Sequence, residues 1–128
     1  MSRPTVVVHP DAATLARATA ARLLVQLLDD QSTHRPVHVV LTGGTVGIAT
    51  LAEVAGSPLR HGVDWSGVHL WWGDERYLPD GSADRNETQA RTALLDHLDL
   101  PARNVHPMAA ADAPGITTPE QAAAAYAA

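Results

Sequence analysis

Two short segments of this 128-residue chain carry residue types that could bind an anion or move a proton. The first is the run TGGT at 42–45, which follows an apolar stretch. Glycines let backbone N–H groups approach a ligand closely, and the start of a helix carries about half a positive charge. The second is the run DER at 74–76, where an arginine could bind an oxyanion and a carboxylate could transfer a proton. Together they predict a site for a phosphorylated or acidic small molecule.

Each segment also has a purely structural interpretation. A glycine pair after a strand is often only a tight turn, and the acidic pair beside Arg76 could form a local ion pair or cap a helix. Segment 42–47 matches neither the P-loop nor the dinucleotide pattern, since the lysine and the required glycine spacing are absent. For Glu75, pairing with an arginine and touching a ligand both remain open.

The surrounding pattern predicts an α/β fold, a Rossmann-like parallel sheet with helices on both faces. Apolar, largely β-branched runs predict strands at 5–9, 37–41, 68–72 and 105–106. Helical periodicity predicts helices over 12–28, 45–55 and 84–98 and another that starts after Thr118, with Asp11 capping the first of them and Ser82 or Asp84 the third. Ligands bind beyond the carboxyl ends of parallel strands. If strands 37–41 and 68–72 are neighbours, both chemically active segments therefore open onto one cleft.

The sheet expected from this pattern is narrow, with three principal strands. The last helix reaches residue 128 without a glycine stop signal. We therefore expect residues 1–128 to be the truncated, amino-terminal part of a single larger domain. The alternative is a small complete domain whose last helix frays.

Composition excludes several classes of function. Nine arginines and no lysine face 14 acidic residues, so the net charge is −5 with the histidines neutral. Without a cationic stripe we expect no general affinity for nucleic acid or acidic membranes. The absence of cysteine excludes disulfides, thiolate metal ligands and cysteine nucleophiles. With no membrane-length apolar stretch and no signal-peptide core at the start, we expect a soluble, cytoplasmic protein.

The sequence predicts no metal site. Segment 80–91 lacks the central glycine and the terminal glutamate that a calcium loop needs. His34 and His38 are four residues apart, but Pro36 prevents the helix that would bring both rings to one metal. A surface pair of histidines explains them better.

Three motifs, in their order and spacing, resemble those of the 6-phosphogluconolactonases over essentially the whole chain. The run WGDERYLP at 72–79 is the specific one; TGGT precedes it, DRN at 84–86 follows it, and Leu78 stands where valine is commoner. The resemblance implies a fold similar to the glucosamine-6-phosphate deaminases and ribose-5-phosphate isomerases. It also implies hydrolysis of 6-phosphoglucono-1,5-lactone to 6-phosphogluconate in the oxidative pentose phosphate pathway, with no metal or organic cofactor.

The same resemblance implies a role for individual residues. Asp74 and Arg76 would be catalytic, with Asp74 orienting either a histidine or the ring hydroxyls of the substrate. The substrate's phosphate is close to a dianion at neutral pH, and loop N–H groups together with Arg76 would bind it. The implied substrate-binding residues are Thr42, Gly43, Gly44, Thr45, Arg76 and Asn86.

One part of the family's pattern is missing from this chain. The family's second signature is a glycine-rich segment ending in Asp-Gly-His or Glu-Gly-His, and its histidine is thought to activate water. None of the seven histidines here has that context. The resemblance therefore implies that the partner of this chain is the carboxyl-terminal half of the same domain, and that residues 1–128 alone have negligible activity. Two alternatives remain, an amino-sugar phosphate deaminase or isomerase on the same scaffold and a non-catalytic sugar-phosphate-binding module.

Overall fold

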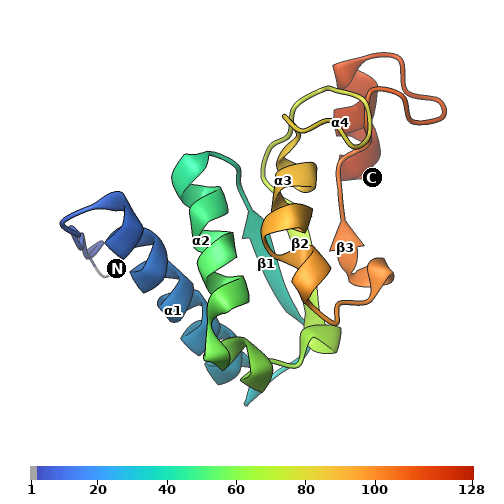
Figure 1. The fold of residues 1–128 in the computed structure, drawn as a ribbon. Coiled ribbons are helices and arrows are strands. Elements are labelled where there is room, and N and C mark those ends of the chain that lie inside the picture. The colour runs from blue at the N-terminus through green and yellow to red at the C-terminus, as the bar shows by residue number, and fades with distance from the viewer. Residues whose placement is uncertain (1–2) are drawn as a thin grey trace.

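The computed structural model describes residues 3–128 as a small parallel sheet with four α-helices (Figure 1). The strands β1 (Val37–Leu41), β2 (Val68–Trp72) and β3 (Val105–His106) are all parallel and lie in the order β1-β2-β3. The helices are α1 (Ala12–Gln31), α2 (Thr45–Gly56), α3 (Asn86–Ala93) and α4 (Pro119–Ala127). The predicted α/β class and parallel sheet are confirmed, and so are the bounds of the strands at 37–41, 68–72 and 105–106.

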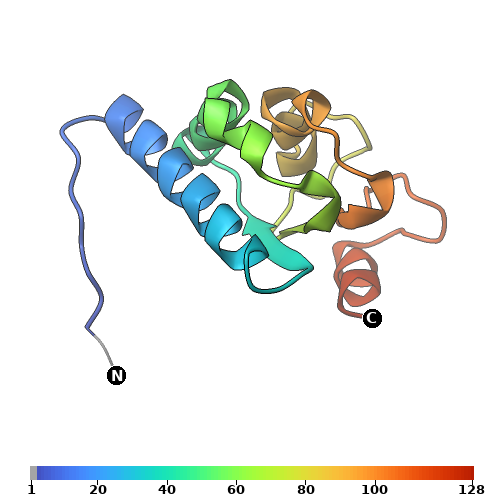
Figure 2. The same cartoon turned by 90° about the horizontal axis from the view of Figure 1, so that it is seen from below.

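One face of the sheet is buried beneath three helices. Side chains alternate along a strand, and the register pairs Leu41 with Trp72, so the apolar residues of β1 and β2 share one face. Figure 2 shows α1, α2 and α3 side by side along that face. Leu24 of α1 and Val54 of α2 are fully buried there. Burying such a side chain contributes about 1.5–3 kcal/mol, so this core stabilises the packing of the helices on β1 and β2.

The opposite face of the sheet carries a row of aromatic rings. His38, His69 and His106 follow one another across β1, β2 and β3, with neighbouring ring centroids 5.1 Å apart. Trp71 stacks on His106 at 3.9 Å and donates a 3.0 Å hydrogen bond from Nε1 to Nδ1 of His38. The hydroxyl of Tyr126, on α4, donates to the carbonyl of His106 at 2.6 Å. Helices therefore lie on both faces of the sheet, as predicted.

The strand predicted at 5–9 is wrong. The segment lies apart from the helices in Figure 2 and pairs with none of the strands of the described sheet. Val6 and Val8 are 83% and 85% exposed. β-Branched residues favour an extended backbone, but a strand also needs a neighbouring edge to accept and donate its hydrogen bonds.

The helix predicted over 84–98 is shorter, because α3 starts at Asn86 and the backbone leaves the helical conformation at Leu94, where φ is −138° and ψ is −57°. Neither Ser82 nor Asp84 caps it, since Arg85 occupies the capping position and offers no capping side chain. The cap comes instead from the loop after β2, as described below.

The other helices begin as predicted. Asp11 caps α1 by accepting the N–H of Thr14 at 2.7 Å, and this bond lowers the pKa of Asp11. Thr118 accepts the N–H of Gln121 at 3.2 Å at the start of α4. Over residues 3–128, none of the helices combines the length and the hydropathy that crossing a membrane requires.

The histidine row makes stability depend on pH. Burial lowers the pKa of His69 below its ordinary 6.5, and the neighbouring His106, His38 and Arg103 lower it further. The folded chain thus keeps this ring neutral where the unfolded chain protonates it. The stability it confers is complete above the unfolded value and is lost as the pH falls toward the folded pKa.

We expect the free energy of unfolding to fall more steeply for the unmodified chain than for His69→Gln as the pH is lowered from about 8 to about 5.5. Urea denaturation of both proteins at a series of pH values measures this. A stability difference between them that stays constant over the range would contradict the assignment.

Candidate functional site

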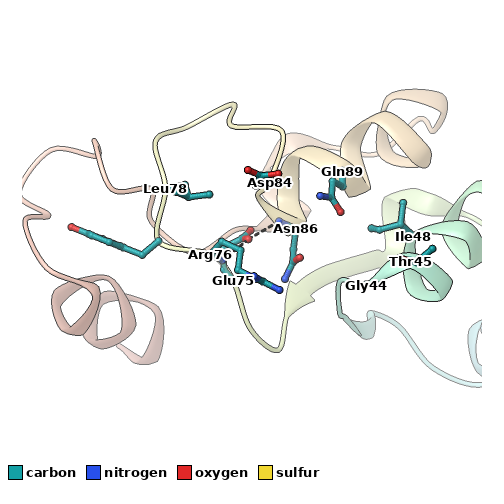
Figure 3. A pocket seen from close by; sticks show the side chains of 10 residues that line it. Gly44, Thr45, Ile48, Glu75, Arg76, Leu78, Asp84, Asn86 and Gln89 are labelled. Carbon is teal, nitrogen blue, oxygen red and sulfur yellow. Dashed lines mark hydrogen bonds between the residues drawn. The ribbon is translucent and has the colours of Figure 1, made fainter.

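The loops after β1 and β2 meet at the carboxyl end of the sheet. The N–H of Gly73 donates to the carbonyl of Leu41 at 2.9 Å, which continues the pairing of the two strands beyond β2. A cavity of about 790 Å³ opens between the loops (Figure 3). It is lined by Gly44, Thr45, Ile48, Glu75, Arg76, Tyr77, Leu78, Asp84, Asn86 and Gln89. The predicted cleft shared by the two segments is therefore present.

An adjoining hollow of about 490 Å³ shares Gly44, Arg76 and Asn86 with this cavity. Together the two spaces touch every residue that the sequence singled out for the site. These are Thr42, Gly43, Gly44, Thr45, Asp74, Arg76 and Asn86. The fold thus brings them together from two loops and the start of α3.

The start of α2 lies at the cavity, where Gly44 and Thr45 form part of the lining. Gly44 precedes the helix with φ at +89°, a conformation that favours glycine, and it has no side chain to cap the helix. The first helical hydrogen bond runs from the N–H of Ile48 to the carbonyl of Gly44 at 2.9 Å. The earlier N–H groups, at 45–47, have no acceptor among the described residues. Their partial positive charge is available to an anion.

Arg76 supplies a second positive group at the same cavity. The residue is exposed, and within the described chain its guanidinium forms no ion pair and no hydrogen bond. Figure 3 shows its side chain beside Asn86, with Gly44 and Thr45 across the cavity. A free guanidinium facing an uncapped helix start is an arrangement that can hold a phosphate or a carboxylate.

The start of α3, by contrast, is already filled by a carboxylate. Glu75 accepts the N–H of Asn86 at Oε1, 2.6 Å away, and the N–H of Glu87 at Oε2, 2.8 Å away. Its side chain is 5% exposed and lies 3.6 Å from Nη2 of Arg85. Of the two alternatives left open for Glu75, the contacts favour pairing with an arginine. The positive end of α3 is consequently occupied.

Arg85 is the residue of this region that sequence reasoning missed. Its side chain is 1% exposed, and its Nη2 donates to Oε1 of Glu87 at 3.1 Å and to the carbonyl of Met108 at 2.8 Å. Its Nε and Nη1 are buried without a partner among the described residues. Residue type does not distinguish a buried arginine from an exposed one. The only signal was its place in the motif at 84–86.

Asn86 connects the two loops. Its Nδ2 donates to the backbone carbonyl of Asp74 at 3.2 Å and lies 3.4 Å from the side-chain Oδ1 of Asp74. Its Oδ1 also lies against Gly43, where an added Cβ would be only 2.0 Å away. The missing side chain at Gly43 thus makes room for Asn86. No group of three or more histidine, aspartate or glutamate side chains within residues 3–128 is arranged to hold a metal ion.

We predict that Gly43→Ala displaces Asn86 and lowers the free energy of unfolding by about 1–3 kcal/mol, the usual cost of overpacking. The matched control is Gly56→Ala at the end of α2, where no atom lies within 4 Å of the added methyl group. Urea denaturation compares the two. Equal stability of both variants would show that Asn86 and Gly43 are not closely packed.

Comparisons with known proteins identify the family of this chain. The sequence matches the family model described as glucosamine-6-phosphate isomerases/6-phosphogluconolactonase over residues 10–128. It is 52% identical to the 6-phosphogluconolactonase of Streptomyces coelicolor over 124 residues, which cover 97% of this chain and 48% of that relative. It is 43% identical to the 6-phosphogluconolactonase of Mycobacterium leprae over 121 residues, which cover 94% of this chain and 48% of that relative.

A solved structure gives the same result. The 6-phosphogluconolactonase of Trypanosoma brucei is similar with a TM-score of 0.76 and 27% identity, over 98% of this chain and 47% of that one. This chain therefore spans about half the length of the relatives it matches. The resemblance drawn from the three motifs is confirmed: the chain belongs to the glucosamine-6-phosphate isomerase/6-phosphogluconolactonase family.

Proposed function

We propose that this chain is the part of a 6-phosphogluconolactonase that binds the phosphate of the substrate. The observation that carries the proposal is that the start of α2 and Arg76 line one cavity, and that neither the helix start nor the guanidinium has a partner in the described part of the chain. A phosphate at neutral pH is close to a dianion. It would accept hydrogen bonds from the N–H groups of 45–47 and from Arg76, each contributing about 1.5–3 kcal/mol. The names of the relatives support 6-phosphoglucono-1,5-lactone as the substrate.

The proposed reaction is hydrolysis of this lactone to 6-phosphogluconate, a step of the oxidative pentose phosphate pathway. Water adds to the C1 carbonyl and gives a proton to a general base, the bond between C1 and the ring oxygen breaks, and that oxygen gains a proton. A positioned base contributes about 10²–10⁴-fold. We assign to Asp74, which is exposed at the rim and held by Asn86, the orientation of that base or of the ring hydroxyls.

We further propose that residues 1–128 are the amino-terminal part of a single domain whose other part supplies the base. The match to only 48% of the length of the relatives supports this. So does apolar surface that further structure would cover, namely the exposed side chain of Val40, on the face of the sheet that carries the histidine row, and the exposed valines at 6–8.

As part of the same proposal, the protein works in the cytoplasm without a nucleic-acid or membrane partner. A sugar phosphate is confined to the compartment in which it is made, because moving its charge into an apolar bilayer is costly. The net charge of −5 gives no reason for binding to nucleic acid or acidic lipid.

The test is an assay of lactone hydrolysis with the product of the complete reading frame and its Arg76→Ala variant. Loss of two charged hydrogen bonds should lower kcat/KM by about 100-fold or more, chiefly through KM. Arg17→Ala is the matched control, because this exposed arginine lies on α1 and, among residues 3–128, pairs only with Glu53 of α2, at 3.5 Å. It should leave both constants unchanged. Residues 1–128 alone should show negligible hydrolysis.

An unchanged kcat/KM for Arg76→Ala would contradict the phosphate site. Hydrolysis by residues 1–128 alone that Arg76→Ala abolishes would contradict the dependence on a distant base. Tight binding of 6-phosphogluconate with no turnover by the full protein would indicate a binding module. Release of ammonia from glucosamine 6-phosphate, with no lactone hydrolysis, would assign the protein to the other branch of the family.

A further inference from the structure

Two consecutive residues of the loop after β2 have opposite surroundings. The carboxylate of Glu75 is almost completely buried, whereas Arg76 is exposed and its guanidinium has no partner in the described chain. We propose that Glu75 is a positioning residue: it fixes the backbone from which Arg76 reaches the anion and ties that backbone to the start of α3. The inference rests on the proposed function only in taking Arg76 as the anion-binding group.

A single carboxylate holds three backbone N–H groups. Oε1 of Glu75 accepts from Arg76 at 2.8 Å and from Asn86 at 2.6 Å, and Oε2 accepts from Glu87 at 2.8 Å. The bond to Arg76 closes a tight ring between neighbouring residues, so it restricts the peptide that joins them. The bonds to Asn86 and Glu87 anchor the same carboxylate to α3. The direction in which the Arg76 side chain leaves the loop is thereby coupled to a rigid helix.

Arg85 holds the carboxylate from the opposite side. Its Nη2 lies 3.6 Å from Oε2 of Glu75 and 3.1 Å from Oε1 of Glu87, and it also donates to the carbonyl of Met108. A charged group in so buried a place is costly without a partner of opposite charge. If Glu75 turned into the cavity, Arg85 would lose part of its compensation. Glu75 is one of the residues that line the cavity, and the buried pair holds its carboxylate on the backbone N–H groups of the loop and of α3.

The same contacts keep α3 from competing for the anion. Both helices begin at this cavity, and an open helix start attracts negative charge. Because Glu75 fills the first turn of α3, the open N–H groups of α2 and the guanidinium of Arg76 are left as the anion-binding set. Glu75 would thus determine both the direction of Arg76 and the position of the phosphate.

A double-mutant cycle in the product of the complete reading frame tests the coupling. Glu75→Gln keeps the size of the side chain but replaces one accepting oxygen by a donor, and it should raise the KM for 6-phosphoglucono-1,5-lactone by about tenfold. In an Arg76→Ala background the same substitution should change KM by less than about twofold, because Arg76 is the group through which Glu75 acts. The control is Glu87→Gln, whose carboxylate contacts the same buried arginine but, within residues 3–128, accepts no backbone N–H from the loop. It should leave KM unchanged even where it lowers the melting temperature.

A purely structural role for Glu75 would lower the melting temperature and the active fraction but not KM, and this result would overturn the proposal. Equal losses in both backgrounds would overturn it as well, since Glu75 would then act independently of Arg76. If the full protein fails to hydrolyse the lactone, the proposed function fails. The cycle then measures the dissociation constant of 6-phosphogluconate or inorganic phosphate in place of KM.

Amide hydrogen exchange on the unmodified full protein gives a readout that depends on neither a substrate nor a folded variant. The N–H of Arg76 should exchange at least about tenfold more slowly than that of Tyr77, for which the described residues provide no acceptor. Equal exchange rates would overturn the proposal.

Discussion

Gly44 lets the chain turn directly from the carboxyl end of β1 into α2, and no side chain of residues 3–128 accepts the first N–H groups of the helix. Across the same cavity α3 also begins, but the carboxylate of Glu75 has taken its N–H groups. Two helix starts therefore face one space, and one of them is open. An anion that enters the cavity meets the open start of α2 and the guanidinium of Arg76, which has no partner among the residues that the structure describes. This asymmetry determines where we place the phosphate.

The rest of the fold keeps these groups at fixed positions. β1 and β2 pair in parallel, so their carboxyl ends emerge next to each other, and the core beneath α1, α2 and α3 holds that register. Asn86 then connects the two loops by bonding to Asp74 and by filling the space that Gly43 leaves. The site is therefore built mainly from backbone geometry and close packing. This is why a methyl group at one glycine is expected to disturb it.

The sequence predicted the central sheet well because the signals there are local. Pro36 precedes the strand at 37–41 and Gly73 follows the strand at 68–72, so each apolar run has clear limits. Local signals could not predict whether 5–9 forms a strand. Its residues favour an extended backbone, but they do not show whether the edge of a sheet lies close enough to pair with them.

The motifs also identified the residues that gather at the cavity, but they did not indicate which of them are buried in the structure and which face the ligand. Glu75 and Arg76 are adjacent, yet one is buried and the other exposed. Arg85, further along the same loop, is buried beside the carboxylate of Glu75. The spacing of residues does not show which side chains of one loop meet after folding. The cap of α3 was misassigned to Ser82 or Asp84 for the same reason.

A titration of the isotope-labelled protein with 6-phosphogluconate, followed by NMR, tests the central claim most directly. If the phosphate sits at the open helix start, the backbone amides of 45–47 and the guanidinium of Arg76 shift on binding. The amides of Asn86 and Glu87, already bonded to Glu75, stay nearly unchanged. The largest shifts at Asn86 and Glu87, or shifts that avoid both helix starts, would contradict the account.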